Sequence, residues 1–148
     1  MNTKDINGFI FNHVGDFYIN SVRSVKKYTW WEKKDKKREH LSTCIQLFDD
    51  NSDKVKELVY LVTVDGNVMY VGDFSNSFRA RWLKTENYTW HHKDHLIEDE
   101  LIKRKKVSLW FIADPYVNTT SGVELNISKS IEHHILKNNN LNWNKRNN

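Results

Sequence analysis

The residues best suited to chemistry are two tyrosines that lie ten positions apart in one compact segment. Tyr60 and Tyr70 belong to the stretch 58–72, and two arginines, Arg79 and Arg81, follow it closely. A tyrosine can act as a base near neutral pH only if nearby cations favour its deprotonated form and so lower its pKa from the usual value of about 10. A guanidinium group pairs its planar fork with phosphate or carboxylate oxygens. This combination indicates a site that handles an anionic group such as a phosphate.

The segment that carries the tyrosines reads as a β-hairpin, with two β-branched runs on either side of the turn signal Asp65–Gly66. A two-residue loop would place Tyr60 and Tyr70 on opposite faces of the hairpin. A three-residue loop over 65–67 pairs Val62 with Tyr70, which puts both phenols on one face, roughly 7–8 Å apart as diagonal neighbours. We expect the three-residue loop, because only then can both tyrosines serve one site.

Further elements must position the rest of the site. The expected elements are a short helix from Ser77, a helix over 91–104, a strand over 107–112, a polar loop to about residue 122 and a helix over 126–137. Glu132 lies on the edge of the apolar stripe of the last helix. Residues 1–55 have mixed patterning and are expected to form an added arm. The expected fold is α/β (α+β), a small three-stranded mixed or antiparallel sheet flanked by helices.

Two basic runs with aromatic neighbours indicate nucleic acid as the partner. One run covers 33–38, after Tyr28, Trp30 and Trp31, and the other covers 103–106, before Trp110. Lysine and arginine attract phosphates, and flat aromatic rings can stack on bases or sugars. Runs of charge are also common on solvated faces without any partner. The residues expected to contact DNA are Lys33, Lys34, Lys36, Lys37, Arg38, Arg79, His92 and Lys105.

Composition excludes several classes of protein. Cys44 is the single cysteine, so an intrachain disulfide and a cysteine-based zinc site are excluded. His91, His92 and His95 are close together, but they lack a carboxylate at clear spacing, so contact with DNA or proton transfer is favoured over zinc. Nothing approaches the roughly 20 apolar residues of a membrane span, and no secretion signal is present. The expected setting is the cytoplasm of a bacterial or phage-infected cell.

The ordered set of residues resembles the GIY-YIG endonuclease family and, within it, the phage endonuclease II branch. The resemblance covers residues 57–145, about three fifths of the chain. Leu58-Val59-Tyr60 matches the first half of the family's sequence motif, and Tyr70-Val71-Gly72 matches the second half. Arg81 follows at the place of the family's helix arginine, and Lys93 opens the segment 93–97. Glu132 matches the metal-binding glutamate, and Asn144, after Trp143, matches the terminal asparagine.

The resemblance implies a role for each of these residues. Tyr60 would be the general base, with Lys93 or Arg81 lowering its pKa, and Tyr70 would position water or phosphate. Arg81 would pair with phosphate oxygens, a place for which Arg79 competes. Glu132 would hold one Mg²⁺ or Mn²⁺ per active site, and Asn144 would brace the site.

The implied function is divalent-metal-dependent hydrolysis of double-stranded DNA by an endonuclease of phage or restriction type. Residues 56–148 would form the nuclease domain, and the arm over 1–55 would contact DNA or another subunit. A homo-oligomer, dimer or tetramer, is expected, because cutting two strands with one site per chain generally needs a second subunit. The alternatives are a non-cleaving DNA-binding module on a nuclease-like fold and an RNA-processing nuclease. Asp73 and Phe74 depart from the small or basic pair frequent in the family, so an acidic group would lie near the phosphate.

Overall fold

A computed structural model describes residues 2–29, 34–49, 52, 57–74 and 92–144, and of these it gives 20–29, 34–43, 74 and 92–95 by their backbone alone. The main sheet is antiparallel throughout and has six strands in the order β1-β2-β6-β4-β5, with β3 also paired to β2. The strands are β1 (Thr3–Ile6), β2 (Phe9–Thr29), β3 (Lys34–Leu47), β4 (Leu58–Val64), β5 (Asn67–Phe74) and β6 (Val107–Ala113). The expectation of three strands was therefore wrong, although an α+β architecture with a largely antiparallel sheet is found.

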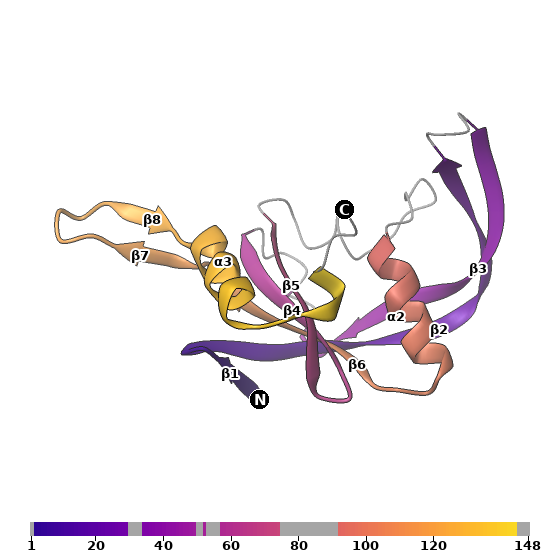
Figure 1. Cartoon of the computed structure of the whole chain (residues 1–148), viewed down its shortest axis with the longest axis horizontal. Coiled ribbons are helices and arrows are strands. Elements are labelled where there is room, and N and C mark those ends of the chain that lie inside the picture. The colour runs from indigo at the N-terminus through magenta and orange to yellow at the C-terminus, as the bar shows by residue number, and fades with distance from the viewer. Residues whose placement is uncertain (1, 30–33, 50–51, 53–56, 75–91, 145–148) are drawn as a thin grey trace.

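The additional strands come from the stretch expected to be an arm. β2 pairs with β6 from Asn12↔Phe111 to Asp16↔Ser108, while β1 and then β3 pair along its other edge. The boundary expected at residue 55 thus falls between β3 and β4, two strands of one sheet. Beyond a register shift after Ile19, β2 and β3 continue as a two-stranded ribbon that rises away from the sheet (Figure 1). The roles expected for this region stay predictions.

Two helices lie on either side of the β4–β5 hairpin (Figure 1). They are α2 (His92–Ile102) and α3 (Ser128–Asn138), both close to their expected ranges. Ile97 of α2 packs into the apolar cluster that contains Tyr60 and Tyr70. Ile131 and Ile135 of α3 pack into a second cluster with Val59, Leu61 and Val71. All seven residues of β4 are buried, as expected for a strand covered on both faces.

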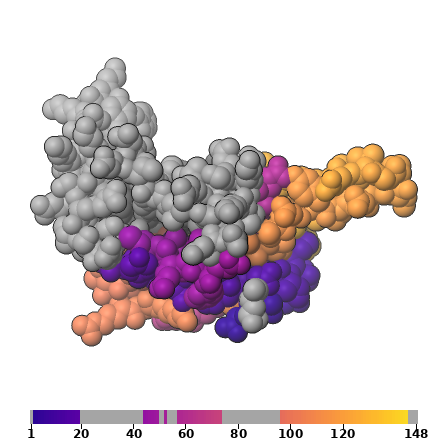
Figure 2. All heavy atoms as spheres, turned by 180° about the vertical axis from the view of Figure 1, so that it is seen from behind, coloured from indigo at the N-terminus to yellow at the C-terminus, as the bar shows by residue number. Residues whose placement is uncertain are grey.

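The stretch after β6 forms a hairpin, where a polar loop was expected. β7 (Tyr116–Asn118) pairs with β8 (Glu124–Asn126) around a turn in which the Thr119 side chain accepts a hydrogen bond from the Val123 amide at 3.1 Å. Figure 2 shows this hairpin projecting from the body of the molecule. The turn residues are small and polar, so the sequence pattern there could not distinguish a hairpin tip from an open loop.

The chain ends, within the described residues, in the short helix η2 (Asn142–Asn144) beside β5 (Figure 1). Among the helices that the structure describes, none has the length and apolar character needed to cross a bilayer.

Candidate active site

The β4–β5 hairpin places both tyrosines on one face, but by a different route from the one expected. Asp65 and Gly66 have φ of 49° and 84°, the positive values of a two-residue type I′ turn. Val64↔Asn67 and Thr63↔Val68 then pair normally, and the next pair is Val62↔Tyr70. One extra residue, Met69, is therefore accommodated in a β-bulge, which shifts the register by one position. The three-residue loop was wrong, whereas the Val62↔Tyr70 pairing was right.

Gly72 lies beneath the two phenol rings. Tyr60 is directly opposite Gly72 in the register, and the centroids of the Tyr60 and Tyr70 rings are 5.7 Å apart with 40° between the ring planes. A Cβ added at Gly72 would meet Cζ and Oη of Tyr60 at 2.7 Å and Cε1 of Tyr70 at 2.8 Å. The rings occupy the space that any other residue would fill. Because Tyr60 is 3% exposed and Tyr70 is 8% exposed, packing holds both rings in place.

Replacing this glycine tests the arrangement. We expect Gly72→Ala to displace at least one phenol ring and to lower the free energy of unfolding by about 1–3 kcal/mol, the usual cost of overpacking a filled interior. The NMR cross-peaks between the two rings report the displacement, and urea denaturation reports the stability. Gly8→Ala is the control for the cross-peaks alone: a Cβ there meets nothing within 4 Å, but the φ of 92° strains a side chain and lowers stability by itself. Unchanged cross-peaks in Gly72→Ala would contradict the described packing.

Asn144 fastens the short helix η2 to the outer edge of β5. Its side-chain Nδ2 donates to the Val71 carbonyl at 2.8 Å, and its Oδ1 accepts from the Val71 amide at 2.9 Å. Because β5 ends the order of the sheet, these backbone groups face away from β4, and the amide side chain takes the place of a further strand. Leu141 packs on the α3 side and Trp143 on the tyrosine side, so the chain wraps around this edge.

Removing the Asn144 amide leaves both Val71 groups without this partner. We expect Asn144→Ala to lower the free energy of unfolding by about 1–3 kcal/mol, the penalty for unsatisfied backbone groups in a partly buried place. Chemical denaturation measures this value. Asn142→Ala is the matched control, since Asn142 is exposed in the same short helix. Equal losses of stability in the two variants would show that the contact between Asn144 and the β5 edge does not stabilise the fold.

Asp73 points to the side of the hairpin opposite to the tyrosines. Side chains alternate along a strand, so Asp73 and Gly72 face opposite ways. Asp73 Oδ2 lies 3.5 Å from Nζ of Lys129, a residue of α3. The acidic group that departs from the family pattern therefore pairs with a lysine on the α3 side, away from the phenol rings.

Glu132 is a partly buried residue of α3, one turn after Lys129. Its neighbour Ile131 is buried against the hairpin, and the Lys129–Asp73 pair joins this flank of the helix to β5. Glu132 thus lies on the side of β5 that α3 covers, whereas Tyr60 and Tyr70 lie on the opposite side. A site that uses all three must be built around the β5 edge that Asn144 covers.

The structure describes the positions of only some of the other residues expected to act in catalysis or to contact DNA. Lys93 and His92 lie in the first turn of α2, and Lys93 precedes Ile97 by about one helical turn. The ribbon formed by β2 and β3 carries four of the expected DNA-contact residues in β3: Lys34, Lys36, Lys37 and Arg38. Lys105 follows α2, and its Nζ lies 3.3 Å from Glu100 Oε2. Arg79, Arg81 and Lys33, together with the helix expected from Ser77, lie outside the described residues.

Sequence reasoning did not identify two of the residues that support the hairpin. Lys129 was not considered, although a lysine three residues before Glu132 on the same helix was visible in the sequence. Gly72 was used only as part of the Tyr-Val-Gly triplet. A glycine inside a strand is a known signal for the close approach of another group, and that signal was present.

Comparison with known proteins yields little. No protein-family model matches the chain, and no curated protein matches it. Among solved structures, the chain is similar to a mutant of bacteriophage T4 EndoII, with 17% sequence identity and a TM-score of 0.46 over 66% of this chain and 85% of that one.

Proposed function

We propose that this protein is a divalent-metal-dependent endonuclease that hydrolyses phosphodiester bonds of double-stranded DNA. The observation that carries the proposal is the pair of phenols packed over Gly72 on one face of the hairpin. A nuclease of the GIY-YIG kind requires both tyrosines on one face. The β-bulge at Met69 meets that requirement, because the two-residue turn alone would place the two tyrosines on opposite faces of the hairpin.

Hydrolysis of a phosphodiester needs a proton acceptor for water and positive charge for the developing negative charge on phosphate. In the proposal, the deprotonated Tyr60 oxygen takes the proton from the attacking water and becomes a hydroxyl, and Tyr70 orients water or phosphate. Arg81 pairs with the phosphate oxygens, and Lys93 or Arg81 keeps the Tyr60 phenol able to act as a base. Asn144 holds the edge of β5, so that the spacing of the two rings is maintained when DNA binds.

Glu132 is the proposed holder of one Mg²⁺ or Mn²⁺ ion. Among the described residues, no group of three or more histidine, cysteine or acidic side chains is arranged so that it could hold a metal ion. A site with one carboxylate fits Mg²⁺, which commonly keeps several waters and binds one or two carboxylates together with substrate phosphates. The ion, when bound, supplies charge neutralisation on the phosphate. Glu132 is partly buried, so its carboxylate is held to a limited set of positions on the flank of α3.

The proposal extends to the assembly. Each chain offers one tyrosine pair, and cutting both strands of a duplex generally requires two sites. We therefore propose a homo-oligomer, a dimer or a tetramer, and expect the basic residues of the β2–β3 ribbon to contact the DNA backbone. Analytical ultracentrifugation with and without duplex DNA measures the number of subunits.

A plasmid assay tests the proposed activity. Purified protein is incubated with supercoiled plasmid and Mg²⁺, beside Glu132→Ala and Arg81→Ala. Cleavage by the wild type that is lost in both variants and in EDTA supports the endonuclease. Binding of DNA without cleavage in Mg²⁺ and in Mn²⁺ would favour the non-cleaving module instead. Preferential cutting of RNA would favour the RNA-processing alternative.

A further inference from the structure

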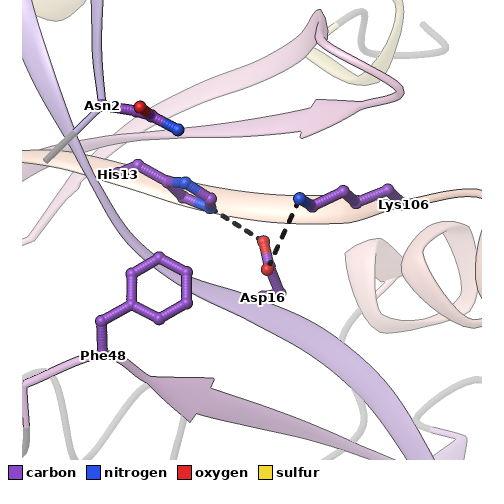
Figure 3. Close-up of a pocket in the computed structure, with 5 residues that line it drawn as sticks. All are labelled: Asn2, His13, Asp16, Phe48 and Lys106. Atoms are coloured by element: carbon purple, nitrogen blue, oxygen red, sulfur yellow. Dashed lines mark hydrogen bonds and ion pairs between the residues drawn. The ribbon is translucent and has the colours of Figure 1, made fainter.

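A pocket of about 540 Å³ lies beside the turn of the β4–β5 hairpin, where Lys106 and Asp65 exchange two hydrogen bonds, on the face of the sheet opposite to the tyrosines. Five residues line it and surround one open space (Figure 3). They come from the start of the chain, from β2, from the end of β3 and from the connection into β6: Asn2, His13, Asp16, Phe48 and Lys106.

The pocket is separate from the tyrosine pair. His13 is paired with Trp110 in the β2–β6 register, and Asp16 is paired with Ser108. Trp110 belongs to the apolar cluster of Val59 and Leu61, on the face opposite to the tyrosines. Substitutions in the pocket can therefore be made without touching the rings of the proposed active site.

Asp16 and His13 form a fixed polar wall. His13 Nε2 lies 2.8 Å from Asp16 Oδ1, and the Ser108 hydroxyl donates to the same oxygen at 2.6 Å. The His13 ring stacks on Trp110 with centroids 4.6 Å apart. Because the serine donates to the carboxylate, and not to the histidine, this cluster lacks the link between nucleophile and base that covalent catalysis requires. The wall is suited to binding and not to nucleophilic chemistry.

The second oxygen of Asp16 remains able to accept hydrogen bonds. Among the described residues, its nearest cation is Nζ of Lys106 at 3.9 Å, beyond hydrogen-bond distance, and none of these residues donates to it. The Asp16 carboxylate would repel a small anion placed here, and the Lys106 ammonium group would repel a small cation. The lining therefore favours a neutral polar group that donates a hydrogen bond. At the rim, the Phe48 ring is 62% exposed and offers a flat apolar surface.

Lys106 adds positive charge to the lining of the pocket. Lys106 is the last member of the run 103–106, all of whose residues are exposed. Lys103 and Lys105 share Glu100 as their ion-pair partner, at 3.8 Å and 3.3 Å, so the run keeps a net positive charge. A basic rim beside an exposed aromatic ring is the combination with which proteins grip single-stranded nucleic acid.

We propose that this pocket binds one unpaired nucleotide of a single-stranded nucleic acid. The base stacks on Phe48 and donates its exocyclic amine to Asp16, a contact that carboxylates make with cytosine. The Asn2 amide is available to the same base edge, and Lys106 with the adjacent basic run takes the phosphates. Adenine, cytosine and guanine carry such an amine, whereas thymine does not, so the pocket favours the first three over thymine.

Fluorescence anisotropy with labelled hexanucleotides tests this site. The probes are single-stranded hexamers of deoxycytidylate, deoxythymidylate and cytidylate, and EDTA is present so that no cleavage is involved. We expect wild-type protein to bind the deoxycytidylate hexamer more tightly than the thymidylate hexamer. Phe48→Ala should weaken binding of deoxycytidylate by about five- to a hundredfold, the range for loss of one stacked base. The cytidylate hexamer tells whether the strand bound is DNA or RNA.

Four further variants make the result decisive. Leu125→Ala removes another exposed apolar side chain, in β8, and should bind as the wild type does. Phe48→Tyr keeps a ring at the rim and should restore binding, which a merely unfolded Phe48→Ala would not explain. Lys106→Gln should weaken all three probes, whereas Lys137→Gln, on exposed α3 surface, should not. Equal affinity of wild type and Phe48→Ala, or equal affinity for cytidine and thymidine strands, would overturn the proposal. A failure of plasmid cleavage would leave this binding result unaffected.

Discussion

Tyr60→Phe is expected to lower the initial rate of plasmid cleavage by about 10²- to 10⁴-fold, the usual contribution of a positioned general base. The ring packs over Gly72 and beside Tyr70, and phenylalanine keeps that packing while it removes only the hydroxyl. The fold should therefore survive, which circular dichroism and the melting temperature report. The loss should appear in the rate at saturating DNA, because the hydroxyl acts on the reacting water.

The matched control is Tyr18→Phe, which removes a hydroxyl from a tyrosine that is 44% exposed on β2. We expect this variant to cut at close to the wild-type rate. If Tyr60→Phe keeps more than half of the wild-type rate, Tyr60 is not the base, and the phenol pair would be a packing feature of the hairpin.

Glu132→Gln is expected to have the second large effect. The substitution keeps the size of the side chain and removes the negative charge that a divalent cation needs, so cleavage should fall by about 10³-fold or more, given that a catalytic ion contributes several kcal/mol. Because Ile131 and Ile135 hold α3 against the hairpin, the helix should remain in place. The cleavage rate is measured as a function of Mg²⁺ concentration.

Glu124→Gln supplies the comparison, since Glu124 is an exposed carboxylate of β8. This variant should retain both its rate and its Mg²⁺ dependence. A Glu132→Gln protein that cuts normally at ordinary Mg²⁺ concentrations would remove Glu132 from the metal site and would leave the α3 side of β5 without its proposed role.

The β4–β5 hairpin shows which structural features could be predicted from the sequence. The two β-branched runs predicted β4 and β5 correctly, and the Asp65–Gly66 pair predicted the turn. The position of Met69 in a bulge could not be read from the residues, because a bulge is decided by how the strands twist and pack together. The shared face of the tyrosines was therefore expected correctly, but from the wrong loop length.

The N-terminal third shows where sequence patterns fail. β2 is 21 residues long and has different partners along its length, β1 and β6 near its start and β3 beyond. Over its described side chains, residues 9–19, buried positions occur in a run at 13–15, so no simple alternation marks this part of the strand. His13 and Asp16 are four and seven residues into this strand, and only pairing with β6 brings them to Trp110 and Ser108. The pocket residues were consequently not recognisable as a group.

The most direct test of the central claim is a digest of a defined circular duplex DNA, with the cut ends sequenced. We expect internal cuts in duplex DNA that require Mg²⁺ or Mn²⁺ and that disappear in Tyr60→Phe. DNA that is bound but left uncut by the wild-type protein in both metals would contradict the account, and the tyrosine pair would then belong to a binding module.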